Sequence, residues 1–336
     1  MLVLSGCGGA EESDENAVND DPKEKTIEIF AMDTYMTITV YGDNAESAAE
    51  KAGEEINRID ELLSTGNPES EISKLNSEKK MKVSPETFDL IKRSKDIGSD
   101  TNGVFDITIY PVMRAWGFAG GDYRVPPELE LREILNDVDY TEIELNEDDL
   151  TVRLKDTMEV DLGGIAKGYT SDRLRDLLTD CGIEHALINL GGNVYVLGNK
   201  TDGSDWRVAI MDPEDQSGYI GGVAVSDKAV ITSGGYQRFF EEDGKRYIHI
   251  IDPSDGYPAS SGLISATVVS DDGTLADALS TSLFIMGPDK AVDYWRANAD
   301  KFECVLVEDD GTVLVTEGLK DCYFTDGEFE IVSQNG

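Results

Sequence analysis

The segment Val160–Tyr169 (VDLGGIAKGY) constrains the folding of this chain more than any other stretch. It has the pattern of a buried strand end that carries Asp161, followed by a glycine pair and by Lys167 at the start of a helix. Glycines let a backbone approach a ligand closely, and the free N–H groups at a helix N-terminus favour anions. The segment therefore predicts a strand, a turn and a helix that together hold a phosphorylated ligand.

The known phosphate-binding signatures differ from this segment. The P-loop places its lysine after the last glycine, whereas Lys167 precedes Gly168, and the dinucleotide fingerprint G-x-G-x-x-G is absent. Taken alone, the segment is explained equally well by a tight strand-to-helix turn with a solvated lysine. The segments that accompany it along the chain favour the functional interpretation.

The overall charge excludes some ligands and restricts how others are held. The 336 residues carry 68 acidic and 29 basic side chains, a formal net charge of −39. Nucleic acids are held by clustered Lys and Arg, so this composition argues against nucleic-acid binding. An anionic substrate then requires a local positive group, which we expect to be a metal ion or a helix N-terminus. The length and a hydrophobic content of 40% allow one large domain or two interleaved ones.

The N-terminal segment predicts a lipid anchor. Leu4-Ser5-Gly6-Cys7 has the pattern of a lipobox, in which the cysteine becomes lipidated. Small and acidic residues follow, a composition typical of a flexible tether. We therefore expect residues 1–25 to tether a domain of residues 26–336 to the extracytoplasmic face of the cell membrane; an ordinary N-terminus with an incidental cysteine is the alternative. No later apolar run of the sequence reaches transmembrane length.

Strands and helices are predicted in mixed order along the domain. Thr34–Tyr41 alternates like a half-buried strand, Glu46–Leu63 repeats apolar residues at helical spacing, and Ser84-Pro85 has the pattern of a helix start. The lack of a regular βαβ repeat predicts an α+β fold with mixed or antiparallel sheets and packed helices. Further helices are expected at 168–178 and 274–286, and further strands at Ala186–Leu190, Val194–Leu197, Trp206–Ile210, Val230–Thr232, Tyr247–Ile251 and Leu263–Val269.

Several other segments occur together with VDLGGIAKGY in a specific order along the chain. They are Ala31-Met32-Asp33-Thr34, Gly103-Val104-Phe105-Asp106, Leu190-Gly191-Gly192-Asn193, His249-Ile250-Ile251-Asp252-Pro253 and Ala276-Asp277-Ala278-Leu279-Ser280-Thr281. Each motif is weak alone, but the ordered set resembles the ApbE family, the lipoproteins known as FAD:protein FMN transferases. The resemblance extends from about Ile27 to Met286 and implies an ApbE-like α+β fold.

The resemblance also implies a reaction and its residues. Members of the family split FAD at its pyrophosphate, release AMP and attach FMN through a phosphoester to a threonine of a partner protein, with Mg²⁺ as cofactor. The implied acceptors are flavoproteins of membrane or extracellular electron transfer. His249 matches the histidine regarded as the catalytic base. The implied magnesium site consists of the Gly164 carbonyl, Asp277 and Thr281, and the implied FAD-binding positions are Met32, Val104, Phe105, Asp106, Asp161, Lys167 and Ile251.

The residues themselves are compatible with this chemistry but leave alternatives. Asp277 and Thr281 lie four positions apart on a predicted helix and share a face, where their oxygens suit a hard cation such as Mg²⁺. Small polar side chains that only face water are the alternative for this pair, and core packing is the alternative for Met32 and Phe105. His185 is expected to be structural, and the segment Leu190–Asn193 is explained equally well by a simple hairpin turn.

Rival functions remain open from the sequence. A FAD pyrophosphatase would use water in place of the threonine, and a FAD-binding lipoprotein would bind without turnover, although the metal pair together with His249 argues against pure binding. One departure from the family is Ser64-Thr65-Gly66, because relatives commonly carry an aromatic residue after Ser-Thr, and a stacking contact to the flavin or adenine is expected to be missing. The remaining cysteines lack metal-ligand spacing and allow at most one disulfide among Cys181, Cys304 and Cys322.

Overall fold

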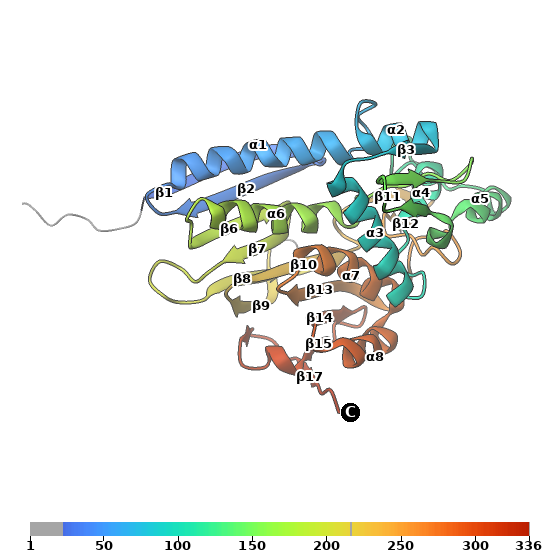
Figure 1. Ribbon diagram of the computed structural model, residues 1–336. Coiled ribbons are helices and arrows are strands. Elements are labelled where there is room, and N and C mark those ends of the chain that lie inside the picture. The colour runs from blue at the N-terminus through green and yellow to red at the C-terminus, as the bar shows by residue number, and fades with distance from the viewer. Residues whose placement is uncertain (1–22, 216, 336) are drawn as a thin grey trace, which may run out of the picture.

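The structure, a computed structural model, describes residues 23–215 and 217–335. Cys7 and most of the predicted tether lie outside the described residues. Within the described residues, a nine-stranded sheet forms the centre of the molecule in the order β1-β2-β6-β7-β10-β13-β14-β15-β17 (Figure 1). Its strands are β1 (Glu24–Ala31), β2 (Thr34–Tyr41), β6 (His185–Leu190), β7 (Asn193–Leu197), β10 (Lys228–Gly234), β13 (Leu263–Ser270), β14 (Glu303–Glu308), β15 (Val313–Thr316) and β17 (Glu330–Val332).

Alternation along the strands builds a separate core on each face of this sheet. In β10, Ala229 and Ile231 pack into the core on one face, whereas Val230 packs into the core on the other. This follows from the strand geometry, because successive side chains point to opposite faces. Most neighbouring strands pair antiparallel, and β15 and β17 pair parallel.

Helices cover one face of the sheet. Figure 1 shows α1 lying along β1 and β2, and α6 contacts both α1 and α7. The apolar stripe of α1 is buried, with Ala52, Ile56 and Ile59 fully covered, which confirms the helix predicted there. The helices of this layer are α1 (Ala45–Leu63), α6 (Ala166–Asp180), α7 (Gly273–Met286) and α8 (Pro288–Asn298).

A smaller antiparallel sheet covers the other face. Its valines and Trp206 pack against Val196, Val230 and Val305 of the central sheet. Its strands are β8 (Trp206–Met211), β9 (Tyr219–Val225) and β16 (Tyr323–Phe324).

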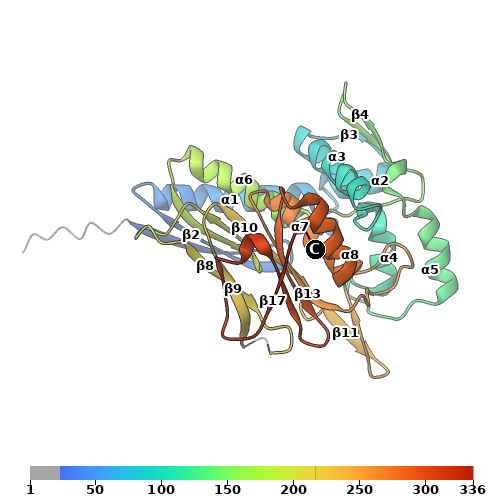
Figure 2. The ribbon, with the colours of Figure 1, turned by 90° about the horizontal axis from the view of Figure 1, so that it is seen from below.

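The remaining elements gather at one end of the molecule, as both Figure 1 and Figure 2 show. They form two further apolar cores, one that includes Phe88, Phe105 and Leu162 and one that includes Trp116 and Ile251. These elements are α2 (Glu71–Glu78), α3 (Pro85–Asp100), α4 (Tyr110–Trp116), α5 (Glu128–Ile134), the strands β3 (Lys80–Lys82), β4 (Glu144–Asn146) and β5 (Thr151–Arg153), and the hairpin of β11 (Phe239–Glu242) and β12 (Lys245–Ile248).

The predicted α+β class is confirmed, and some local predictions are wrong. β1 was not predicted, and the segment around Met32 forms the turn after it. The strand predicted to end near Val160, before the glycine pair Gly163-Gly164 (the glycine turn), is also wrong. The Asn76 side chain takes the place of a neighbouring strand there. Its amide oxygen accepts from the Val160 N–H at 2.7 Å, and its Nδ2 donates to the Val160 carbonyl at 2.8 Å. The strand expected at Tyr247–Ile251 ends at Ile248.

Other predictions concern single residues and spans. His185 Nδ1 lies 2.7 Å from the Asn199 carbonyl oxygen, and the structural role expected of this residue stays a prediction. Cys181, Cys304 and Cys322 are free thiols. Across residues 23–215 and 217–335, no helix combines the length and the apolar character that a membrane crossing requires.

Candidate active site

The glycine turn and α7 meet at the N-terminus of α6. Ile165 occupies the N-cap position of α6, and its side chain has no oxygen that could accept from the free N–H groups of the first turn. An acceptor comes from α7 instead, because Asp277 Oδ2 accepts a hydrogen bond from the Gly168 N–H at 2.8 Å. The carboxylate therefore caps α6 from a neighbouring helix.

This cap changes the role of Gly164. In a regular α-helix the Gly168 N–H would donate to the carbonyl four residues earlier, which belongs to Gly164. Because Asp277 accepts that N–H, the Gly164 carbonyl oxygen accepts no hydrogen bond within the described residues. A carbonyl oxygen with unused lone pairs thus lies at the same helix terminus as the Asp277 carboxylate.

Asp277 and Thr281 are held by further polar side chains. Asp277 is 5% exposed, and its Oδ1 accepts from Asn193 Nδ2 at 2.8 Å. An ionised carboxylate offers about four lone-pair positions, so both oxygens retain acceptor capacity. Thr281 Oγ1 lies 3.0 Å from Ser233 Oγ. The structure therefore places Asp277 and Thr281 on α7, as the sequence predicted, and adds Asn193 and Ser233 as their neighbours.

Strand turns bring Met32 and Asn193 to this region. Gly191 and Gly192 form the turn between β6 and β7 with φ of +68° and +101°, a conformation that favours glycine. A Cβ on Gly191 would lie 2.3 Å from Thr34 Oγ1, so this turn packs closely on the start of β2. Met32 Sδ lies 3.8 Å from Thr170 Oγ1 of α6. Leu190–Asn193 is thus a hairpin turn, and Asn193 also reaches the Asp277 carboxylate.

Phe105 lies beside the glycine turn, and Asp106 follows it in the chain. A Cβ on Gly164 would lie 3.3 Å from Phe105 Cε2, which places the aromatic ring against the turn. The Asp106 carboxylate is directed into the protein, where it accepts from the N–H groups of Thr108 at 2.8 Å and Tyr140 at 3.0 Å. Burial raises the pKa of Asp106, and these hydrogen bonds oppose the rise. The half-buried Val104 precedes this pair, and contact of all three with FAD stays a prediction.

His249 follows β12 and faces the positive groups of the site. Its Nδ1 lies 3.1 Å from the Arg238 carbonyl oxygen. With the proton on Nδ1 to make this hydrogen bond, Nε2 is the nitrogen that can accept a proton. Burial, reinforced by the charges of Arg238 and Lys167, lowers the pKa of His249 to about 4, although the hydrogen bond to Arg238 opposes the change. The imidazole is therefore neutral at pH 7.

Asp161 and Lys167 lie in the same electrostatic environment. Burial raises the pKa of Asp161, and the Gly163 N–H, Lys167 and Arg238 oppose the rise. Lys167 forms no ion pair with any described residue, so its charge is available to an anionic ligand. Ile251 differs from these residues, because its side chain is 4% exposed and packs in the apolar core with Trp116.

The sequence predicted no role for Ser233 or for Arg238, and it included Asn193 only as part of the segment Leu190–Asn193. Arg238 lies next to His249. Its guanidinium donates to the Phe118 carbonyl, and its charge acts on both Asp161 and His249. A usable signal was its position immediately before the hairpin that leads to His249, in an acidic chain with few cations. Among the residues that the structure describes, no three or more His, Cys, Asp or Glu side chains cluster as a metal site. The predicted magnesium site would not form such a cluster, because its donors are a carbonyl, one carboxylate and a hydroxyl.

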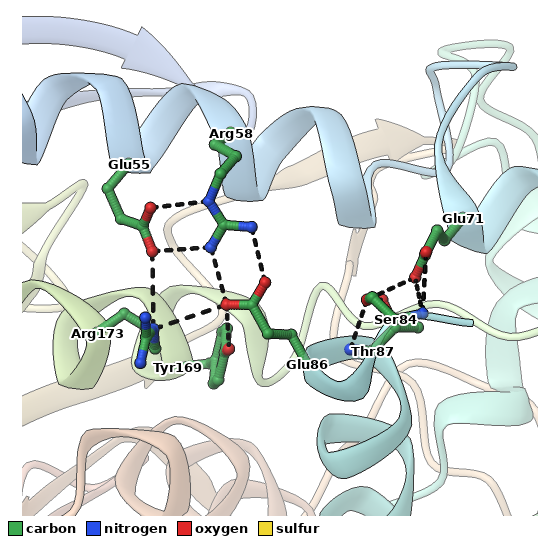
Figure 3. A network of polar contacts seen from close by, with 8 residues as sticks. All are labelled: Glu55, Arg58, Glu71, Ser84, Glu86, Thr87, Tyr169 and Arg173. Atoms are coloured by element: carbon green, nitrogen blue, oxygen red, sulfur yellow. Dashed lines mark hydrogen bonds and ion pairs between the residues drawn. The ribbon is translucent and has the colours of Figure 1, made fainter. Parts of the chain in front are cut away.

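An ion-pair network holds another side of α6 (Figure 3). Arg58 of α1 donates through Nη1 and Nη2 to the Glu86 carboxylate of α3 at 2.7 and 2.8 Å, and through Nε to Glu55 Oε2 at 2.8 Å. From α6, the Tyr169 hydroxyl donates to Glu86 at 3.2 Å, and Arg173 Nε lies 3.6 Å from Glu55 Oε1. We call these five residues the Arg58 network.

The loop that departs from the family pattern is ordered by serines. Ser70 Oγ donates to the Ser64 carbonyl at 2.5 Å, and Ser73 Oγ donates to the Thr65 carbonyl at 3.1 Å. The Gly66 N–H donates to Ser64 Oγ at 3.2 Å. Hydrogen bonds to α2 and its N-cap therefore set the course of this loop.

Comparison with known proteins gives a consistent result. Residues 32–306 match the model of the ApbE family. A relative from Klebsiella pneumoniae (strain 342), named FAD:protein FMN transferase, is 36% identical over 260 residues, which cover 76% of this chain and 80% of the relative. A relative of the same name from Vibrio cholerae is 34% identical and covers 76% of this chain and 78% of its own length.

Solved structures agree with the sequence relatives. The crystal structure of the ApbE protein from Thermotoga maritima has a TM-score of 0.84 and 33% identity, and the match covers 89% of this chain and 99% of that one. The flavin transferase ApbE from Vibrio cholerae has a TM-score of 0.80 and 28% identity, over 90% of this chain and 99% of its own. With most of its length matched in sequence and in structure, the chain belongs to the ApbE family.

Proposed function

We propose that this protein is a FAD:protein FMN transferase, which transfers the FMN half of FAD to a threonine hydroxyl of an acceptor protein and releases AMP. The names of the relatives support this activity. One observation carries it to this chain. The Gly164 carbonyl has no hydrogen-bond donor among the described residues, and it lies at the helix terminus that Asp277 caps.

The donor set fits Mg²⁺. Gly164 offers a carbonyl oxygen, Asp277 a carboxylate with spare lone pairs and Thr281 a hydroxyl, which are the hard oxygen ligands that this cation prefers. When bound, Mg²⁺ would neutralise charge on the pyrophosphate and on the leaving AMP. Lys167 and Arg238 add positive charge on the side of His249.

The chain's own residues then account for the proton transfer. The threonine oxygen attacks the phosphorus on the FMN side, and His249 Nε2 accepts the hydroxyl proton. A bond forms between the threonine oxygen and that phosphorus. The bond between the same phosphorus and the bridging oxygen breaks, and the bridging oxygen leaves with AMP. The low pKa of His249 keeps the imidazole neutral and ready to accept.

Partner and location follow from the same proposal. The acceptors are flavoproteins of membrane or extracellular electron transfer that carry an accessible threonine. Cys7 is lipidated and anchors residues 26–336 at the extracytoplasmic face of the cell membrane. Cys7→Ala should release the protein from membranes into the soluble fraction, and unchanged partitioning would refute the anchor without affecting the chemistry.

The test of the function is a flavinylation assay. The purified protein is incubated with FAD, Mg²⁺ and an acceptor flavoprotein domain, and the acceptor is examined by mass spectrometry for an FMN adduct on threonine. We expect the adduct with Mg²⁺, its loss with a chelator, and none on an acceptor with Thr replaced by Val. Production of FMN and AMP without an adduct would establish a pyrophosphatase instead, and FAD binding without turnover would establish a flavin carrier.

A further inference from the structure

Asp172 of α6 is a buried carboxylate that the proposed chemistry leaves unused. It is 8% exposed, and its oxygens accept hydrogen bonds from the first turn of α7. Oδ1 accepts from the Gly273 N–H at 2.9 Å, and Oδ2 accepts from the Thr274 N–H at 2.8 Å and from Thr274 Oγ1 at 2.6 Å. The side chain therefore caps α7 from the neighbouring helix.

The two helices cap each other. Asp172 on α6 binds the N-terminus of α7, while Asp277 on α7 binds the N-terminus of α6 through Gly168. Each carboxylate lies where the helix macrodipole favours negative charge. We call the four residues Gly168, Asp172, Gly273 and Asp277 the α6–α7 crossing.

Backbone meets backbone at this crossing. A Cβ on Gly168 would lie 2.1 Å from the Gly273 carbonyl oxygen, and a Cβ on Gly273 would lie 2.3 Å from Ser171 Oγ. Ser171 Oγ in turn donates to the Gly168 carbonyl at 2.7 Å. Where the glycines meet, no side chains interdigitate, so the carboxylate hydrogen bonds help to fix how far α7 slides along α6.

α7 has a second capping carboxylate, Asp272, whose hydrogen bonds and ion pair among the described residues do not involve α6. It therefore allows the capping of α7 to be tested separately from the positioning of α7 on α6. Asp272 occupies the N-cap of α7, and Oδ1 accepts from the Leu275 N–H at 2.8 Å. This cap stabilises the start of α7 from within the same segment, and the other carboxylate oxygen pairs with Arg93 of α3, whereas Asp172 ties the start of α7 to α6. Arg175 Nη1, 3.2 Å from Asp172 Oδ1, partly balances its charge.

We propose that Asp172 is a positioning residue for the cation site. It holds α7 at the position along α6 where Asp277 reaches the Gly168 N–H and leaves the Gly164 carbonyl free for the cation. The inference rests on the proposed function, because it concerns the magnesium site of that function. Partners that orient a metal ligand typically change metal affinity by about 10- to 100-fold when they are removed.

The test compares Asp172→Ala with Asp272→Ala in the whole protein of residues 1–336. Both remove a carboxylate that caps α7, but only the first breaks the link to α6. Mn²⁺ serves as the probe, and its binding to the FAD-loaded protein is followed by electron paramagnetic resonance, with no acceptor present. Melting temperature and the KM for FAD are measured in parallel.

We expect Asp172→Ala to weaken Mn²⁺ binding by about 10- to 100-fold, with the KM for FAD unchanged at saturating metal. Asp272→Ala should lower the melting temperature and leave Mn²⁺ affinity as in the wild type. Equal changes of Mn²⁺ affinity in both variants, or a change in neither, would overturn the proposal. If Asp172→Ala does not fold, Asp172→Asn decides, because one amide oxygen can still accept from α7, and we expect an intermediate Mn²⁺ affinity; wild-type affinity would overturn the proposal.

The same experiment separates this inference from the proposed function. A wild-type protein that transfers FMN but binds no Mn²⁺ would overturn the role of Asp172 and leave the transferase assignment intact. A wild-type protein that binds Mn²⁺ but modifies no acceptor would refute the transferase assignment, and the binding measurements would still decide the role of Asp172.

Discussion

Helix α6 is held on two sides by contacts of different physical kinds. At the α6–α7 crossing, buried carboxylates accept hydrogen bonds from backbone N–H groups, with Asp172 8% and Asp277 5% exposed. In the Arg58 network, side chains pair with side chains, and the Arg58 side chain is 44% exposed (Figure 3). The crossing lies beside the predicted site, whereas the network ties α6 to α1 and α3.

The two kinds of contact differ in how strongly they fix the position of α6. A buried N–H or carboxylate that loses its partner bears its full desolvation cost, so the crossing has one favourable arrangement. Exposed ion pairs are screened by water and salt, so the network tolerates small changes. We therefore expect changes at the crossing to alter metal binding and transfer, and changes in the network to alter stability alone.

The strongest test of this comparison removes the carboxylate of Asp277. Asp277→Ala should lower the transfer rate by at least about 10³-fold, because metal stabilisation of transition-state charge is worth several kcal/mol. The transfer rate is measured as the rate of flavinylation of an acceptor at saturating Mg²⁺. Thr281→Ala is the control and should cost far less, because it removes a neutral oxygen. Full activity of Asp277→Ala without added metal would show that the crossing does not serve the chemistry.

The next test concerns the proposed base, His249. His249→Ala should lower transfer by about 10²- to 10⁴-fold while FAD binding, followed by flavin fluorescence, stays nearly intact. His185→Ala is the control and should leave transfer unchanged. If transfer persists in His249→Ala, or FAD binding is lost in parallel, another group takes the proton.

The pH dependence sharpens the same assignment. His249 must be neutral to accept a proton, and its pKa is lowered to about 4. Its contribution to kcat/KM should therefore be constant at neutral pH and fall as pH decreases through about 4, rather than near the ordinary value of 6.5. A His249-dependent acidic limb near 6.5 would show that the imidazole is more exposed to water than its position indicates.

A steric test addresses the close approach of the helices. Gly168→Ala places a Cβ 2.1 Å from the Gly273 carbonyl oxygen, and should lower the free energy of unfolding by about 1–3 kcal/mol. Mn²⁺ affinity should fall with it, because α7 must move. Gly66→Ala is the matched control, since the nearest atom to its Cβ would lie 3.6 Å away. Urea denaturation of both variants checks the difference, and equal stability would contradict the crossing geometry.

The smallest effect is expected in the Arg58 network. Arg58→Ala should lower the free energy of unfolding by about 1 kcal/mol, since the pair is partly exposed, with transfer unchanged. Loss of transfer comparable to that in Asp277→Ala would abolish the distinction between the two sides of α6. Lys92→Ala is the control. It breaks an exposed ion pair with Glu147 and should leave both the free energy of unfolding and the transfer rate nearly unchanged.

The network also predicts a pH window. Hydrogen bonds from Arg58 lower the pKa of Glu55 and of Glu86 below the ordinary 4.5. A lowered folded pKa means that the stabilisation is present above about 4.5 and is lost as pH falls through the folded values. The stability difference between the wild type and Arg58→Ala should therefore shrink below pH 4.5, and a difference that persists there would exclude the carboxylates as its source.

Local patterns identified most elements and the segments that carry the site. Alternation predicted β2, helical spacing predicted α1, and Ser84-Pro85 predicted the start of α3, where Ser84 Oγ accepts from the Thr87 N–H. These features depend on neighbours a few residues away, which a pattern records. The false strand at Val160 shows the limit, because a side chain distant in sequence, Asn76, satisfies that backbone.

The amino-acid sequence was sufficient to predict the α+β class, the order of the motifs and the residues that could serve as ligands and base. The tertiary structure alone decided that Asp277 caps Gly168 from 109 positions away, that Asp172 reaches Gly273 across 101 positions, and that Arg238 lies beside His249. Secondary structure follows from repeating local preferences, whereas such partners are chosen by how helices pack. Burial is likewise a property of the packed molecule, and it is burial that lowers the pKa of His249.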